Sequence, residues 1–132
     1  MVPREEPTPF DDIALMLDAD LGHLPVIRAL AADLGRHVGF GAEDVADFRV
    51  AVDEACSFLI VHAQAGAMLS CLFRVLDAEV RVTAEAGSDD APEADTGSQL
   101  LRLLADCAMT TSATEPDGRS RLIIDMIKGK AD

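Results

Sequence analysis

Apolar residues in the first half of the chain recur with the spacing of helices. Over residues 24–38 they stand three and four positions apart, and charged residues fill most of the opposite positions. Pro25 occupies the first turn, where a helix tolerates proline. A longer pattern of the same kind covers residues 43–62 and opens with Glu43 and Asp44, which the helix dipole favours there. We therefore predict two helices, separated by the glycines of residues 39–41.

Elsewhere apolar and polar residues alternate, as they do in half-buried strands. Over residues 79–85 the alternation predicts that Val80, Val82 and Ala84 face the helices, while the residues between them face outward. The intervening residues 77–78 suit a tight hairpin. The strands predicted in this way cover residues 13–20, 68–76, 79–85, 109–113 and 119–127, and a short leucine-rich helix covers residues 98–108.

The order of these elements predicts an α+β two-layer sandwich. Its sheet would be mixed but largely antiparallel, with about five strands and with the helices on one face. We expect one domain over residues 13–128, a disordered tail over residues 1–12 and a short tail over residues 129–132. Residues 86–96 are rich in acidic residues and predict an exposed loop.

Composition narrows the classes of partner. The 132 residues include 24 acidic and 11 basic side chains, a net charge of −13, which argues against nucleic acid and anionic membranes as partners. The charge favours a basic partner or serves solubility alone. Cys56, Cys71 and Cys107 lack metal-binding spacing and predict buried, reduced thiols of a cytoplasmic protein. No apolar run has the length of a membrane span, and the first residues do not resemble a signal peptide.

The segment AVDEAC at residues 51–56, followed by His62, carries a resemblance to a known family. It resembles the second helix of the RsbW-like anti-sigma factors, the serine-kinase branch of the GHKL (histidine-kinase-like) ATPase superfamily, and in particular an actinobacterial type. The resemblance covers residues 12–128. It implies the GHKL fold, with the loop before the third helix acting as an ATP lid.

The resemblance also implies positions for nucleotide-binding residues. The family's first motif is a Glu with an Asn four residues later, so that both side chains lie on one helical face. The Glu acts on the attacking group, and the Asn oxygen binds the Mg²⁺ that bridges the phosphates. Here Glu54 matches the Glu, but Phe58 occupies the Mg²⁺-ligand position and offers no oxygen. Without the resemblance, Glu54 reads as a solvated helix residue and Phe58 as a core aromatic.

Two further motifs are altered. The family's Asp-x-Gly binds the adenine amino group and lets the backbone approach the base, and residues 85–87 match it with Glu85 and Gly87. The last motif is a glycine pair that surrounds the phosphates, of which Gly97 alone remains. Depending on the alignment, Gln99 or Asp95 replaces the other glycine. Glu54, Glu85, Gly87 and Gly97 are thus expected to be relics of a nucleotide site, with no metal ligand set among the histidines.

The resemblance implies an anti-sigma factor of the stress response, acting by partner switching. It would sequester an alternative sigma factor until an anti-anti-sigma (STAS-type) protein competes, and it would form a homodimer. No cofactor is expected, although residual binding of ATP or ADP with Mg²⁺ is compatible with the remaining motifs. Two alternatives stay open, namely an active Mg·ATP-dependent serine kinase that phosphorylates its antagonist, and a non-enzymatic acidic interaction domain without a sigma partner.

Overall fold

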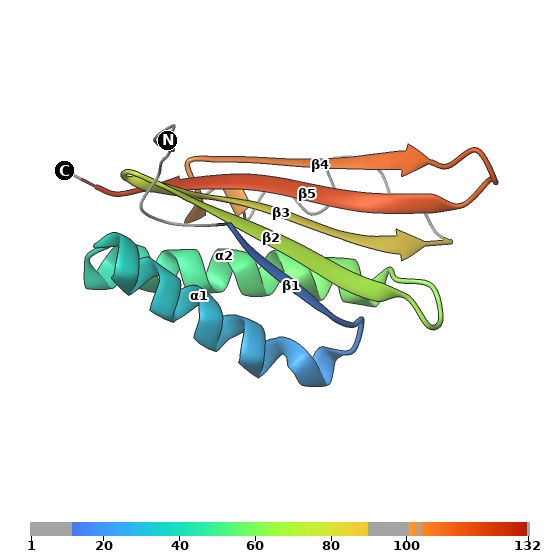
Figure 1. Ribbon diagram of the computed structural model, residues 1–132, viewed down its shortest axis with the longest axis horizontal. Helices are drawn as coiled ribbons and strands as arrows, with labels where there is room; N and C mark the ends of the chain where they lie inside the picture. Colours follow the sequence, from blue (N-terminus) through green and yellow to red (C-terminus); the bar gives the residue numbers. More distant parts are fainter. Residues whose placement is uncertain (1–11, 90–100, 103, 132) are drawn as a thin grey trace, which may run out of the picture.

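The strands of the computed structural model form one sheet, and the two long helices cover one of its faces (Figure 1). The structure describes residues 12–89, 101–102 and 104–131. The sheet order is β1-β2-β3-β5-β4, and all four neighbouring pairs are antiparallel, where a mixed sheet was expected. The elements are β1 (Ile13–Asp18), the 3₁₀ turn η1 (Leu21–His23), α1 (Leu24–Val38), α2 (Ala42–Val61), β2 (Met68–Leu76), β3 (Glu79–Ser88), β4 (Cys107–Thr114) and β5 (Ser120–Gly129). The predicted α+β sandwich is therefore confirmed.

Several predicted boundaries were wrong, each for a local reason. The first strand ends at Asp18, because Asp20 accepts a hydrogen bond from the Gly22 amide at 2.8 Å and starts η1. The predicted helix over residues 98–108 does not reach its expected end, because β4 begins at Cys107 and pairs with β5. Strand β5 continues to Gly129, one residue past the expected end of the domain.

The core lies between the helices and one face of the sheet. Val80, Val82 and Ala84 of β3 are buried as predicted, because alternate residues of a strand face opposite sides of a sheet. Phe48 of α2 and Phe73 of β2 are fully buried in the same core. The described helices include none long and apolar enough to cross a membrane.

The three cysteines do not share one environment. Cys56 of α2 and Cys71 of β2 are buried, with their sulfur atoms 3.7 Å apart, and both are free thiols. The hydrogen bond with the Cys71 sulfur and burial both raise the pKa of the Cys56 thiol above its ordinary value. Cys107 is exposed at the start of β4, so the expectation that all three are buried was wrong. It was wrong because Cys107 follows the alternation of β4 on the face that the helices leave open.

An ion pair and a hydrogen bond join the N-terminus of α2 to the end of β5. The Asp44 carboxylate lies 3.2 Å from the Lys128 ammonium and accepts a hydrogen bond from the Ala131 amide at 3.1 Å. Both side chains of the ion pair are largely buried. The bond from the Ala131 amide and the charge of Lys128 lower the pKa of the Asp44 carboxyl. The charged form of Asp44 is therefore stabilised by folding.

We predict that Asp44→Asn lowers the free energy of unfolding by about 1–3 kcal/mol near pH 7, because it leaves the Lys128 ammonium largely buried without its charge partner. Because the folded-state pKa lies below the unfolded value, the contribution is present above the ordinary carboxyl pKa and is lost as the pH falls below it. Urea unfolding at pH 7 and pH 3 measures the difference. A gap between wild type and variant that persists unchanged at pH 3 contradicts the assignment.

Candidate functional site

Helix α2 presents Glu54 and Phe58 in different surroundings. Glu54 is exposed and has no hydrogen-bond or ion-pair partner in the described part of the chain. Phe58 is half-buried, packs against the core, and its ring centroid lies 4.6 Å from that of His62 at an angle of 52°. Phe58 therefore has a packing role one turn from Glu54. The structure places an aromatic contact where the resemblance puts the Mg²⁺-binding Asn.

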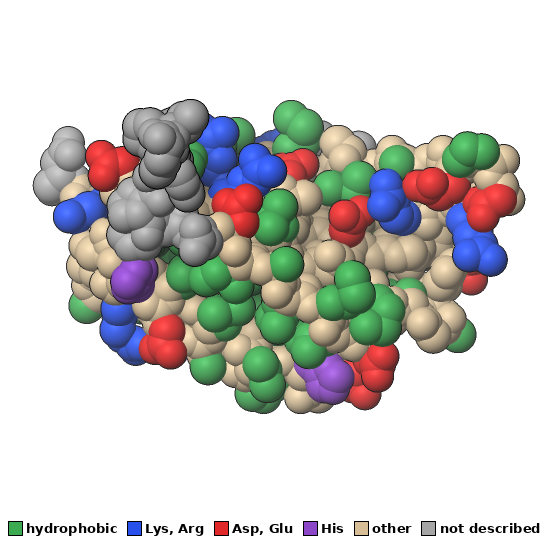
Figure 2. Space-filling view, in the orientation of Figure 1, with side chains coloured by type: hydrophobic (Ala, Val, Ile, Leu, Met, Phe, Trp, Pro, Cys, Tyr) green, Lys and Arg blue, Asp and Glu red, His purple; other side chains and the backbone are tan. Residues whose placement is uncertain are grey.

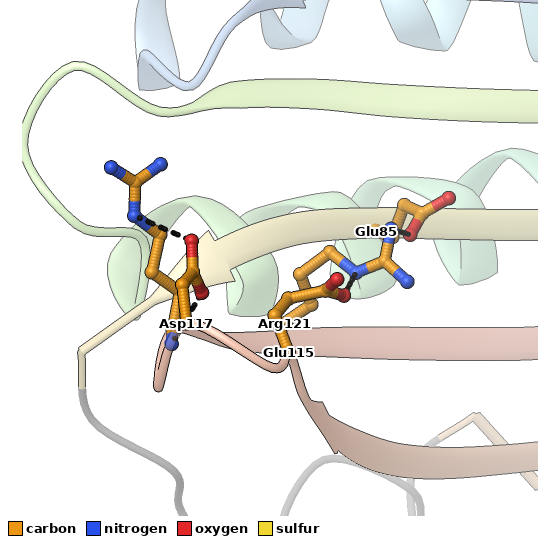
Figure 3. Close-up of polar contacts among 5 residues, drawn as sticks. Glu85, Glu115, Asp117 and Arg121 are labelled. Carbon is orange, nitrogen blue, oxygen red and sulfur yellow. Dashed lines mark hydrogen bonds and ion pairs between the residues drawn. The ribbon is translucent and has the colours of Figure 1, made fainter.

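Glu85 lies on β3, but its side chain belongs to the open face of the sheet. Its neighbours Ala84 and Ala86 are buried toward the helices, so the side chain between them points the other way. There its carboxylate lies 2.9 Å from a guanidinium nitrogen of Arg121, and Arg121 also lies 3.2 Å from the carboxylate of Glu115 (Figure 3). The sheet thus separates Glu85 from Glu54 and Phe58, and the structure does not bring them together.

The surroundings of Gly87 are filled by the segment that follows α2. The backbone amide of Gln64 donates a hydrogen bond to the Gly87 carbonyl at 3.0 Å. A Cβ at residue 87 would stand 3.2 Å from the Gln64 side-chain nitrogen, so this side chain covers the glycine closely. In the resemblance, the corresponding glycine leaves room for the adenine base. Here the side-chain amide of Gln64 lies close to Gly87, so the packing of this side chain alone accounts for a glycine at the position.

Sequence reasoning missed the contact that joins β3 to the end of α2. Ser88 is buried, and its hydroxyl donates a hydrogen bond to the His62 carbonyl at 2.6 Å. The signal was available, because Ser88 continues the alternation of Val80 through Ala86 toward the helices. The composition of residues 86–96 led instead to a predicted loop that began two residues before Ser88. The hydrogen bond satisfies a carbonyl that the helix terminus leaves free.

Part of the candidate site falls outside the described residues. Gly97 and the alternative positions Asp95 and Gln99 lie there, as does most of the acidic segment. Among the residues that are described, no three His, Cys, Asp or Glu side chains gather as a metal site. The described part of the site therefore consists of an exposed carboxylate, a packed aromatic ring and a covered glycine.

We predict that Phe58→Asn lowers the free energy of unfolding by about 1–2 kcal/mol, because a half-buried ring is replaced by an amide without a partner. The control is Glu54→Gln on the same helix, which is expected to change stability by less than about 0.5 kcal/mol because the side chain is exposed. Thermal unfolding of both variants measures this. Equal stability of Phe58→Asn and wild type would show that the ring does not contribute to the core.

Comparison with known proteins assigns the chain to a family. The family model described as "Histidine kinase-like ATPase domain" matches residues 17–124. Proteins named "Serine-protein kinase RsbW" from Bacillus thuringiensis (strain Al Hakam), Bacillus cereus (strain B4264) and Bacillus anthracis (strain A0248) are each 30% identical over 54 residues. That stretch is 41% of this chain and 34% of each relative, so the chain matches about a third of the relatives' length. Because the family model spans most of the chain, the protein belongs to the histidine kinase-like ATPase domain family.

Proposed function

We propose that this protein is an anti-sigma factor of the RsbW-like type that sequesters an alternative sigma factor, with ATP binding weak or lost. The family assignment and the 30% identity to serine-protein kinases named RsbW support the type of protein. The observation that carries the loss of nucleotide is the environment of Phe58, whose ring packs against His62 where a Mg²⁺ ligand is needed. An anti-anti-sigma antagonist of the STAS type would release the sigma factor by competition, and the protein would act as a cytoplasmic homodimer.

Three local features support weak nucleotide binding. Phe58 offers no oxygen to a metal ion. The carboxylate of Glu85 is held by Arg121 on the face of the sheet away from α2. The side chain of Gln64 covers Gly87. Each lost charge-assisted contact to a ligand costs about 1.5–3 kcal/mol, so even two losses weaken binding by roughly two to four orders of magnitude if they add.

The relatives are named serine-protein kinases, which favours a second candidate function, an active serine kinase. This alternative needs Mg·ATP, and Glu54 would be its catalytic carboxylate. The exposure of Glu54 and its lack of a partner in the described residues are compatible with that role. The two functions differ in one measurable property, because the kinase must bind nucleotide with a metal ion, whereas sequestration requires only the complex with sigma.

We predict a specific complex with an alternative sigma factor. Sigma factors carry basic surfaces that face DNA, and the charge of −13 complements them. Association should slow as salt is added, because charges at the rim of an interface mainly set the on-rate. Size-exclusion chromatography with each sigma factor of the source organism at micromolar concentration is the test. If none elutes with the protein, the anti-sigma function is wrong and the acidic interaction domain remains.

We further predict that Mg·ATP binding is absent or weak and that kinase activity is undetectable. Isothermal titration calorimetry with ATP and Mg²⁺ measures binding, and a dissociation constant in the low micromolar range would favour the kinase. Phe58→Asn is the companion variant. If the ring is the main obstacle, the variant regains some metal-dependent binding without full activity, because the surroundings of Glu85 and Gly87 are unchanged. Phe58→Leu, which removes the ring but adds no oxygen, should regain none.

A further inference from the structure

Two cysteine thiols meet in the core and have no part in the candidate site or in the proposed function. Cys56 comes from α2 and Cys71 from β2, and their sulfur atoms lie 3.7 Å apart, within hydrogen-bond distance for sulfur. The two residues are 0% and 1% exposed. The sulfur atoms of a disulfide are about 2.05 Å apart, so a shift of less than about 2 Å would join this pair. The thiols are therefore positioned for a bond between the helix layer and the sheet.

Cys71 lies one strand away from the edge of the sheet. Its partners across the neighbouring strands are Leu15 of β1 and Ala84 of β3. Strand β1 has six residues, and among the described strands its one neighbour is β2. A short edge strand opens at a lower free-energy cost than the core as a whole, and its opening exposes the row that holds Cys71. A small oxidant can thus reach this sulfur without unfolding of the domain.

The charge and the surface of the molecule select among oxidants. The net charge is −13, which repels anionic reagents such as glutathione disulfide. Figure 2 shows that apolar side chains form part of the surface between the charged ones. Hydrogen peroxide is small and uncharged, so neither the net charge nor an apolar surface excludes it. The class of oxidant that suits this pair is therefore a hydroperoxide.

We propose that Cys56 and Cys71 form a redox modification site, at which hydrogen peroxide joins the two sulfur atoms in a disulfide that ties α2 to β2. In the first step the Cys71 sulfur attacks one peroxide oxygen, the O–O bond breaks, and Cys71 becomes a sulfenic acid as one water leaves. In the second step the Cys56 sulfur attacks the Cys71 sulfur, the S–O bond breaks, and the hydroxyl leaves as water with the Cys56 proton. The two thiols together lose two hydrogens and two electrons, and one peroxide is reduced to two waters.

The hydrogen bond between the thiols fixes the order of the two steps. It lowers the pKa of the Cys71 thiol below its ordinary value in spite of burial, and together with burial it raises the pKa of the Cys56 thiol. The thiolate is the nucleophile in such reactions. Cys71 therefore reacts with the peroxide first, and Cys56 keeps its proton until the second step.

The bond closes the chain between the two cysteines into a loop. Residues 57–70 form this loop, and they contain Phe58 and Gln64 of the candidate site. Because a disulfide constrains the unfolded chain, the oxidised protein resists unfolding more than the reduced protein does. The modification site is independent of the proposed anti-sigma function, which requires neither thiol.

Peroxide treatment of the reduced full chain, followed by alkylation with N-ethylmaleimide in denaturant and mass spectrometry, tests the site. Cys107 is exposed and serves as the reference thiol. The expected product links Cys56 to Cys71, takes up no N-ethylmaleimide at either residue, and returns to two thiols with dithiothreitol. Glutathione disulfide is the matched reagent, and it should modify Cys107 while leaving the buried pair reduced.

The thermal unfolding midpoint shows whether the bond fits the fold. In a Cys107→Ser background, which excludes bonds to the exposed thiol, oxidation should raise the midpoint by roughly 5–10 °C. Cys56→Ala in the same background keeps Cys71 alone, so its midpoint should not rise with peroxide.

Two results overturn the proposal. One is that both buried thiols still take up N-ethylmaleimide after all of Cys107 has been oxidised. The other is an oxidised protein whose midpoint is no higher than that of the reduced protein, because the bond would then have formed in unfolded chains and would not fit the fold. A sigma complex measured with the reduced protein tests the proposed function separately, so failure of one proposal is distinguishable from failure of the other.

Discussion

The alternation of side chains along β3 is the constraint on which the rest of the structure depends. Ten residues of this strand pair with β5 and eight pair with β2, so its register is fixed on both sides. Every second residue enters the core against α2, and the residues between them form the open face. The hydrogen bond from Ser88 to His62 and the ion pair of Glu85 with Arg121 both follow from this one register.

Sequence reasoning predicted most of the fold because the spacing of apolar residues indicates which side chains are buried. The helix over Leu24–Val38 has the predicted limits, and the inward residues of β3 are those expected. The third helix and the start of β4 were harder to separate, because a short leucine-rich run fits a helix or a buried strand equally well. The chain is a strand from Cys107 onward because these residues pair with β5. The exposure of Cys107 likewise depends on which face of β4 is covered, and that is a tertiary property.

The candidate site was harder to predict from the sequence than the fold. A motif match gives the identity of a residue but not the face on which it lies. Glu54 and Phe58 could be placed on one helix from their spacing alone. The partner of Glu85 is Arg121, 36 positions later, and the cover of Gly87 is Gln64, in a segment without a predicted element. Neither contact leaves a local pattern, because both depend on the pairing of distant strands and on the path of a connection.

The same register fixes the face of the sheet on which Glu85 lies. To turn the carboxylate of Glu85 toward α2, β3 would have to slip by one residue, and this would move Ala84 and Ala86 out of the core and disrupt pairing with both neighbours. A local bulge would spare the rest of the strand but would break the pairing around Ile123. Substitution at Phe58 changes the metal position and leaves this arrangement as it is. The geometry of β3 directs Glu85 away from α2 independently of the ring of Phe58, which is why the two features support the proposal of weak nucleotide binding without depending on each other.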